Sequence, residues 1–383
     1  MVRIGLSNKF DEQFMATLFE ATAIKGFTIR NRLVRSATWE GMCAPDGRPT
    51  EKLCLLYRKL TEGGIGLLIS GYAFVRPEGK QLPGKMGIHT DDFAEDYEKL
   101  VRTVHDSGGK IAAQIVHAGG QAIPDNSGEQ PVAPSAVKVA HYSTEPRELT
   151  KKEIQEIVYA FGEGAERAKK YGFDAVQLHG AHGYLINQFM SPHTNLREDE
   201  YGGDVENRSR FVTEVYRKVR DKVGNDYPVM IKMNCADNME GGLTIEDGVY
   251  IAKKLSEAGI DAIEVSSGNS ASGIKFGPLR MKINKPEKEA WNMDYARRIK
   301  ASVNCPVMVV GGFRSYGVCE NVIAKDGIDY VTMSRPLIRE PWLPSRWEKG
   351  DRTPARCISC NRCFQPGVEE GGIYCVQDKK EKA

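Results

Sequence analysis

Residues 307–313 read VMVVGGF, an uncharged apolar run that ends in two glycines and an aromatic residue. A second run, Tyr330–Met333, ends in the same way at a polar pair, Ser334-Arg335. Continuous apolar runs of this length are typical of parallel strands that are buried on both faces. Six further strand candidates precede them: Leu33–Thr38, Gly66–Ser70, Lys110–Val116, Ala175–Leu178, Val229–Met233 and Ala262–Val265.

Amphipathic segments separate these runs, and each has the apolar spacing of a helix. They are residues 51–62, 92–107, 150–171, 205–223, 245–258, 293–302 and 315–325. Thr150 and Glu153 form a plausible capping box at the start of one of them. Eight strands, most followed by a helix, predict an α/β protein with a closed (β/α)8 TIM barrel. An open doubly wound sheet would want a glycine-rich turn after the first strand, and Thr38-Trp39-Glu40-Gly41 is not such a turn.

Composition narrows the class of protein. The 383 residues include 53 basic and 51 acidic residues, a formal net charge of +2. This balance gives no reason to expect nucleic acid or an anionic membrane as a partner. No apolar stretch of about 18 residues and no signal peptide are recognisable, so the expected location is the cytoplasm.

Polar, cationic or glycine residues follow every predicted strand. Because the carboxyl ends of barrel strands share one rim, we expect these residues to meet there. They are Thr38 and Trp39, Gly71, Gln114 and His117, His179 and His182, Lys232, Ser266 to Gly268, Gly311 and Gly312, and Ser334 and Arg335. Three long loops would lie on the same face: residues 122–146, 191–207 and 267–291.

The last two strands predict a phosphate site. Gly311-Gly312-Phe313 and Ser334-Arg335 each open a helical segment, where backbone N–H groups bind phosphate. Arg335 adds a charged donor. The alternative is a tight glycine turn and a surface arginine, but the pairing on consecutive strands favours phosphate.

The sequence HGAHGY, residues 179–184, predicts the chemistry. His179 and His182 are three residues apart in a short turn, so both side chains can face one space. No nearby carboxylate or third histidine completes a zinc site. Two imidazole N–H groups could hold a carbonyl oxygen as it becomes an enolate, and Tyr184 could donate a proton.

Residues 177–211, QLHGAHGYLINQFMSPHTNLREDEYGGDVENRSRF, strongly resemble the Old Yellow Enzyme family of FMN-dependent ene-reductases. Further matches are Asn31-Arg32, Gln114 with His117-Ala118-Gly119, Ser266-Ser267-Gly268 and the two strand-seven glycines. The resemblance covers roughly residues 15 to 350. It implies an FMN-binding barrel over residues 1–350, followed by a Cys-rich segment over residues 351–383.

The resemblance also implies roles for individual residues. FMN would accept hydride from NADH or NADPH and pass it to the β-carbon of an activated alkene. His179 and His182 would bind the electron-withdrawing group of the substrate, and Tyr184 would protonate the α-carbon. The implied FMN-binding residues are Ala37, Thr38, Trp39, Gly71, Gln114, His179, Lys232, Ser267, Gly268, Gly311, Gly312, Phe313, Ser334 and Arg335.

Three positions depart from the family pattern. Lys232 replaces the usual arginine of strand five, which keeps the charge but loses the planar fork. Trp39 stands where Thr, Cys or His is common beside the flavin, and Gly120 stands where many members have arginine. These departures put the tuning of the flavin and the preference for a nicotinamide in doubt.

Four cysteines crowd the end of the chain: Cys357, Cys360, Cys363 and Cys375. Their spacing resembles the iron–sulfur segment of the 2,4-dienoyl-CoA reductase and trimethylamine dehydrogenase branch, with one residue fewer between the second and third cysteines. A [4Fe–4S] cluster is the favoured expectation, ahead of zinc or four unliganded thiols.

Three functional hypotheses follow. The first is NAD(P)H-dependent reduction of the C=C bond of a small enone or enoyl substrate. The alternative is a flavin and iron–sulfur electron-transfer or dehydrogenase subunit that works with an electron-donor protein. The third hypothesis, from another class, is a non-catalytic barrel that is stabilised by a metal ion. Homo-oligomerisation is compatible with each of them.

Overall fold

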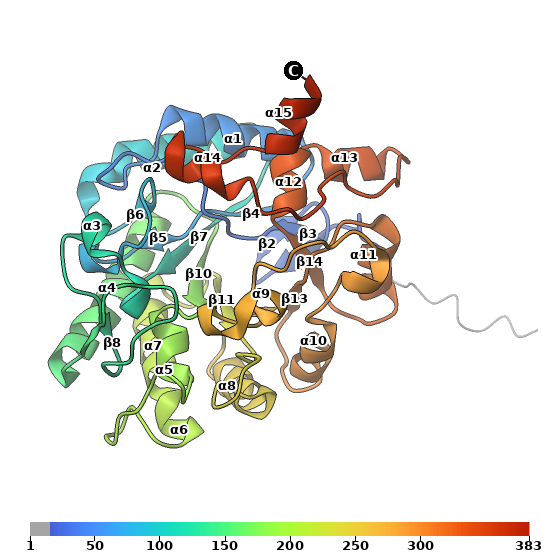
Figure 1. Ribbon diagram of the computed structural model, residues 1–383. Helices are drawn as coiled ribbons and strands as arrows, with labels where there is room; N and C mark the ends of the chain where they lie inside the picture. The colour runs from blue at the N-terminus through green and yellow to red at the C-terminus, as the bar shows by residue number, and fades with distance from the viewer. Residues whose placement is uncertain (1–15, 383) are drawn as a thin grey trace, which may run out of the picture.

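Eight parallel strands close into a barrel in the computed structural model, which describes residues 16–382 (Figure 1). Neighbouring strands follow the order β10-β11-β12-β13-β14-β3-β4-β7, and β7 pairs with β10 to close the ring. The predicted TIM barrel is therefore confirmed. Its strands are β3 (Leu33–Arg35), β4 (Leu67–Ile69), β7 (Ile111–Val116), β10 (Ala175–Gly180), β11 (Val229–Asn234), β12 (Ala262–Ser266), β13 (Val307–Val310) and β14 (Tyr330–Met333).

Helices surround the barrel and lie close to the predicted ranges (Figure 1). The capping box at Thr150 and Glu153 is present at the start of α4. Residue 209 interrupts the predicted helix over residues 205–223 and divides it into α6 and α7. The helices between strands are α1 (Glu51–Glu62), α2 (Ala94–Asp106), α4 (Lys151–Lys170), α6 (Val205–Arg208), α7 (Arg210–Val223), α8 (Ile245–Glu257), α10 (Met293–Lys300), α11 (Tyr316–Ala324) and α12 (Arg335–Arg339).

The barrel interior has two layers of side chains. The layer nearer the amino ends of the strands, here called the lower layer, is apolar, and the layer nearer their carboxyl ends, the upper layer, is polar. Side chains two residues apart on a strand point to the same face, so each lower residue has an upper partner on its own strand. The hairpin of β1 (Thr22–Ile24) and β2 (Phe27–Ile29) packs on the lower layer. The lower layer includes Val34, Ala112, Ala175, Met230, Ala262 and Tyr330. The corresponding upper residues are Ser36, Gln114, Gln177, Lys232, Glu264 and Thr332, all buried.

Short elements break up the loops on the carboxyl side of the barrel. The loops over residues 122–146 and 267–291 line the main cavity, whereas the loop over residues 191–207 contributes nothing to its wall. The additional elements are β5 (Ala73–Phe74), β6 (Met86–Gly87), β8 (Val132–Ala133), β9 (Arg147–Glu148), α3 (Pro124–Ser127), α5 (Leu185–Met190), α9 (Gly273–Phe276), η1 (Pro77–Gly79), η2 (Asp91–Phe93), η3 (Gly119–Gln121), η4 (Ser270–Ser272) and η5 (Pro286–Lys288).

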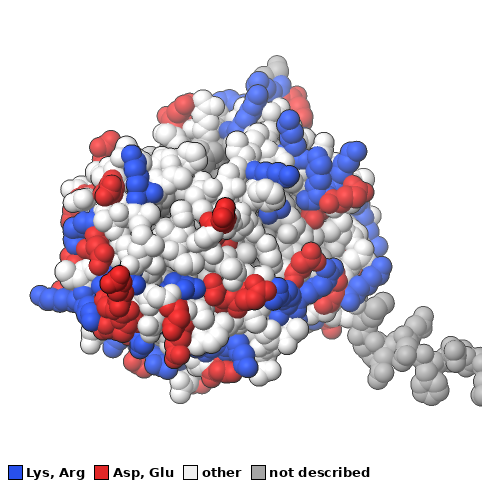
Figure 2. Space-filling view, turned by 60° about the horizontal axis from the view of Figure 1, so that its bottom comes forward, with Lys and Arg blue, Asp and Glu red and all other residues white. Residues whose placement is uncertain are grey.

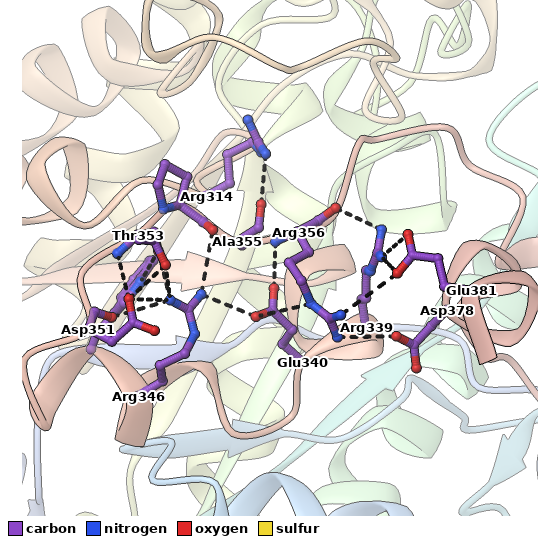
Figure 3. Close-up of polar contacts among 12 residues, drawn as sticks. Arg314, Arg339, Glu340, Arg346, Asp351, Thr353, Ala355, Arg356, Asp378 and Glu381 are labelled. Atoms are coloured by element: carbon purple, nitrogen blue, oxygen red, sulfur yellow. Dashed lines mark hydrogen bonds and ion pairs between the residues drawn. The ribbon is translucent and has the colours of Figure 1, made fainter.

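The end of the chain packs against the barrel through arginine side chains (Figure 3). Arg339 at the end of α12 donates two hydrogen bonds of 2.6 Å to the Glu381 carboxylate. Arg314 donates to the Ala355 carbonyl oxygen at 2.7 Å. The elements involved are α13 (Leu343–Glu348), α14 (Phe364–Glu369) and α15 (Val376–Lys382). The domain boundary at residue 350 stays a prediction.

Charge is mixed on the surface. The face shown in Figure 2 has basic and acidic side chains interspersed around its rim, whereas its centre is mostly uncharged with an acidic side chain in the middle. Within residues 16–382, no helix has both the length and the apolar character that crossing a membrane requires.

Candidate active site

A cavity of about 870 Å3 opens at the carboxyl ends of the barrel strands. This volume lies within the range of roughly 300–1,000 Å3 that is usual for cofactor and ligand pockets. The strand ends that we expected to share one rim therefore do meet there. The predicted site residues that line the cavity are Ala37, Thr38, Trp39, Gln114, His179, His182, Tyr184, Lys232, Gly312, Phe313, Ser334 and Arg335.

Four predicted residues, Gly71, Ser267, Gly268 and Gly311, are not among the residues that line the cavity. A Cβ atom on Gly71 would lie 2.2 Å from Glu40 Oε2, so this glycine makes room for a buried carboxyl group. Ser267 Oγ donates to Asn292 Oδ1 at 2.7 Å and supports the loop behind the wall. Gly268 and Gly311 pack against backbone atoms of the 267–291 loop in the same way.

Lys232 and Glu264 form a buried ion pair in the upper layer of the barrel. Lys232 Nζ lies 3.0 Å from Glu264 Oε1 and 2.7 Å from Ser36 Oγ. Burial alone would raise the pKa of Glu264, but Lys232 and the donated hydrogen bonds hold it below its ordinary value. Glu264 was missed by the sequence-based analysis, although a carboxylate inside an apolar strand is the signal that could have found it. Its charge offsets that of Lys232 below the cavity.

Gln114 offers an unused acceptor to the cavity. Its Nε2 donates to Gln177 Oε1 at 2.7 Å, whereas its own Oε1 is buried and has no partner among residues 16–382. A buried polar atom without a partner is costly, and a bound ligand would relieve that cost. An imide N–H, such as the one on the pyrimidine edge of a flavin, suits this oxygen.

His179 and His182 face one another across a small space, with ring centroids 5.3 Å apart. His182 has a left-handed backbone with φ of 62°, and its N–H donates to Asn234 Oδ1 at 3.2 Å. Burial lowers the pKa of both histidines well below its usual value, so they are neutral at pH 7. His179 Nδ1 accepts the Ala181 N–H at 3.3 Å, which places the ring proton on Nε2.

Tyr184 belongs to a cluster of hydroxyl and amide groups. Its ring centroid lies 4.7 Å from that of His179. The hydroxyl lies 2.8 Å from Tyr72 Oη and donates to Gln81 Oε1, also at 2.8 Å. Burial raises the pKa of Tyr184 well above its usual value. Tyr72 and Gln81 were missed, because both lie in irregular loops that carry no periodic pattern.

The opposite side of the cavity is built from backbone groups. Gly312 has φ of 72°, and a Cβ atom there would lie 2.1 Å from the Trp291 ring. Within the described residues, the backbone N–H groups of Gly312 and Phe313 have no hydrogen-bond acceptor. Free N–H groups beside a glycine suit an anion such as phosphate.

The helix after this glycine pair begins within one residue of its predicted start at residue 315. α11 starts at Tyr316, two residues beyond Arg314. The Glu289 carboxylate accepts the N–H groups of Arg314 and Ser315 at 2.8 and 3.0 Å and the Ser315 hydroxyl at 2.6 Å, so these groups already have a partner. A phosphate would therefore meet the glycine turn and not the end of α11.

Arg335 and Trp39 join the barrel to the end of the chain. Arg335 Nη1 donates to the Arg280 carbonyl oxygen at 2.8 Å and to Asn361 Oδ1 at 2.5 Å. The Trp39 ring lies 4.8 Å from that of Phe364, and its Nε1 donates to the Pro83 carbonyl oxygen. Part of the cavity wall thus comes from the Cys-rich segment.

The four cysteines Cys357, Cys360, Cys363 and Cys375 line one small cavity of about 20 Å3. Across residues 16–382, no group of three or more His, Cys, Asp or Glu side chains is placed to hold a metal ion. Burial raises the pKa of Cys363 to about 11 and that of Cys357 above its usual value, so both are protonated thiols at pH 7.

Comparison with known proteins relates the chain to flavin enzymes. Residues 17–353 match the NADH:flavin oxidoreductase / NADH oxidase family. An NADH oxidase of Thermoanaerobacter brockii is 40% identical over 347 residues, which are 90% of this chain and 52% of the relative. An NADPH dehydrogenase of Geobacillus sp. (strain WCH70) is 34% identical over 85% of this chain and 92% of the relative.

The fold matches as well. The solved structure of an old yellow enzyme homologue from Zymomonas mobilis is 26% identical, with a TM-score of 0.77 over 95% of this chain and 98% of that one. The chain spans about half the length of the NADH oxidase and nearly all of the other two relatives.

Proposed function

The chain belongs to the NADH:flavin oxidoreductase / NADH oxidase family, and from this membership and its cavity we propose that it reduces the activated C=C bond of α,β-unsaturated carbonyl compounds. FMN and a reduced nicotinamide are the cofactors of such an enzyme. The observation that carries the proposal is the meeting of His179, His182 and Tyr184 in one corner of the cavity. Two imidazole groups that could donate hydrogen bonds to an oxygen atom, His179 and His182, then lie beside a proton donor, Tyr184.

We propose that FMN is held by the two sides of the cavity. Gln114 Oε1 would accept the pyrimidine N–H, and the free N–H groups of Gly312 and Phe313 would take the phosphate together with Arg335. The remaining predicted FMN-binding residues would contact or support the ring. When bound, FMN supplies the hydride for the alkene.

The side chains of the chain itself would handle the oxygen atom and the proton. The His179 Nε2 proton is free to donate to a substrate carbonyl, since Nδ1 already accepts a backbone N–H. Neutral imidazoles stabilise developing enolate charge without holding a counter-ion in the resting site. Tyr184 would then give its hydroxyl proton to the α-carbon.

Replacing Tyr184 by Phe tests this assignment. In the reduced, FMN-loaded enzyme, mixed with 2-cyclohexenone in a stopped-flow instrument, reoxidation of the flavin should slow by about 100-fold or more, the usual effect of losing a positioned acid. Reduction of the flavin by NADH or NADPH should be unchanged. Tyr72→Phe is the matched control, because it removes the neighbouring hydroxyl but leaves Tyr184 bonded to Gln81. Wild-type reoxidation in Tyr184→Phe would refute the role.

A second function, electron transfer with a protein partner, rests on the cysteines. We propose that Cys357, Cys360, Cys363 and Cys375 hold a [4Fe–4S] cluster, which is supported by their lining a single cavity beside Arg335. Protein prepared without oxygen should then show a broad visible absorbance that dithionite bleaches and that Cys357→Ser removes. Colour from flavin alone would contradict the cluster.

A further inference from the structure

Lys85 is a buried amine that the proposed reaction does not yet use. It lies directly before β6 and is only 2% exposed. Its Nζ donates to Gln81 Oε1 at 2.6 Å, and burial is the one cause that shifts its pKa. Within residues 16–382 no carboxylate forms an ion pair with it. A lysine without a carboxylate partner in such a place is costly and calls for a physical reason.

Two tyrosine rings surround the amine. Lys85 Nζ lies 3.5 Å from the centroid of the Tyr72 ring and 5.4 Å from that of Tyr184. The face of an aromatic ring attracts a cation, so this position is prepared for an ammonium group even without a carboxylate. The amine therefore lies near the ring of the proposed proton donor, and Lys85 is not among the residues that line the cavity.

The same carbonyl oxygen connects all three groups. Gln81 Oε1 accepts from Lys85 Nζ at 2.6 Å and from the Tyr72 and Tyr184 hydroxyls at 2.8 Å each. An amide oxygen has two lone pairs, so three donors compete for it. One hydroxyl is thus free to turn elsewhere, and the Tyr184 proton can point toward the cavity.

Burial shifts the pKa values of this cluster in opposite directions. It lowers the pKa of Lys85 below its ordinary value and raises that of Tyr184, which is therefore a neutral phenol at pH 7. The other titratable groups that face them are Tyr72, Tyr142 and His179, and the pKa of His179 is lowered mainly by burial and in part by Lys85. Within residues 16–382, no other lysine or arginine lies over the Tyr184 ring.

We propose that Lys85 is a positioning residue for proton transfer, whose ammonium group, held against the Tyr72 ring and near the Tyr184 ring, offsets the phenolate that Tyr184 becomes when it protonates the substrate. The proposal rests on the proposed function. The Tyr184 O–H bond breaks and a C–H bond forms at the α-carbon of the substrate. A proton from the solvent then returns to the Tyr184 oxygen, so the net proton comes from water and Lys85 keeps its own.

Lys85→Met tests the proposal in the FMN-loaded enzyme, because Met fills a similar volume without a charge. Flavin reduction by NADH or NADPH should be unchanged. Reoxidation by 2-cyclohexenone should slow by about tenfold, the effect of a shift of about one unit in the pKa of the acid. The alkaline limb of its pH profile should move to higher pH, because a phenolate without its cation forms less readily. Lys80→Met is the matched control, since Lys80 bonds the Pro45 carbonyl oxygen outside the cavity.

A double variant separates an electrostatic role from a structural one. If Lys85 acts through Tyr184, then Lys85→Met/Tyr184→Phe should reoxidise no more slowly than Tyr184→Phe alone. Lys85→Gln, which keeps a donor for Gln81 but no charge, should behave like Lys85→Met and replaces it if the Met variant does not load FMN. Unchanged reoxidation in both single variants, or a tenfold loss that persists in the Tyr184→Phe background, would overturn the proposal. Fast reoxidation in Tyr184→Phe would instead overturn the proposed function itself.

Discussion

The two sides of the cavity are built from different chemical groups. The end of β10 presents side chains, His179, His182 and Tyr184, whose positions are fixed by hydrogen bonds to other side chains and to neighbouring backbone groups. The ends of β13 and β14 present backbone N–H groups at Gly312 and Phe313, with Arg335 held by the end of the chain. One side is specified by residue identity and the other by backbone conformation.

This difference separates two tasks. Side-chain groups can be tuned one at a time, as burial does for the two imidazoles and the phenol. Backbone groups cannot be replaced by substitution, and they bind whatever anion fits the turn. We therefore expect changes at the end of β10 to alter substrate binding and rate, and changes at Gly312 to alter retention of FMN.

The largest effect should come from the substrate side. Replacing both histidines in His179→Asn/His182→Asn should weaken the affinity for 2-cyclohexenone by about 10- to 100-fold, because two net hydrogen bonds are lost or misplaced. The dependence of reoxidation rate on enone concentration measures this. His105→Asn is the control, because His105 is bonded to Asp174 far from the cavity. An unchanged affinity would contradict the assignment of substrate binding to the end of β10.

A smaller effect should come from the phosphate side. Gly312→Ala forces a side chain into a left-handed conformation and against Trp291, at a cost of about 1–2 kcal/mol. The affinity for FMN should fall about tenfold, as measured by titrating the flavin-free protein with FMN and following its fluorescence. Gly317→Ala should have no such effect, because a Cβ atom there would have nothing within 4 Å. The loaded fraction of Gly312→Ala should still reduce enone at the wild-type rate.

The smallest effect concerns stability in acid. The folded state holds the pKa of both histidines below the ordinary value of 6.5, so the unfolded chain binds more protons at low pH. Above pH 6.5 the two histidines contribute their full share to the free energy of unfolding. Below pH 6.5 the free energy of unfolding should fall, by at most about 1.4 kcal/mol per histidine and per pH unit. Urea unfolding at pH 7.5 and 5.5 should show a smaller loss for the double Asn variant than for wild type. An equal loss would assign the acid sensitivity to other groups.

Strand and helix positions were largely predictable from periodicity and apolar runs. The runs at 307–310 and 330–333 coincide with β13 and β14, and residues 51–62 coincide with α1. What failed depends on contacts that are distant in sequence. The predicted helix over residues 205–223 divides at Ser209, whose hydroxyl oxygen accepts a hydrogen bond from Lys254 of α8.

The site was predictable where one residue type at a strand end suffices, as for Gln114 and Lys232. The cluster of Tyr72, Gln81 and Lys85 was not, because all three lie in the irregular connection between β4 and β6, which has no periodic pattern. Glu264 was overlooked because an apolar strand conceals it. The cysteine spacing predicted a metal site; the four cysteines line one cavity, but among residues 16–382 no group of three or more potential ligands is placed to hold an ion, so the cluster stays a prediction.

The cavity can form only after segments that are far apart in the sequence have come together. Thr38 and Ser334 meet at 2.8 Å although 296 residues separate them, and Trp39 likewise meets Phe364. Contacts between such distant positions carry a large closure entropy and are expected to form late. The first and last thirds of the chain must therefore come together before the pocket exists. We expect the rate of FMN uptake during refolding to report the rate at which the ring of barrel strands closes. FMN binding would then also measure the time course of folding.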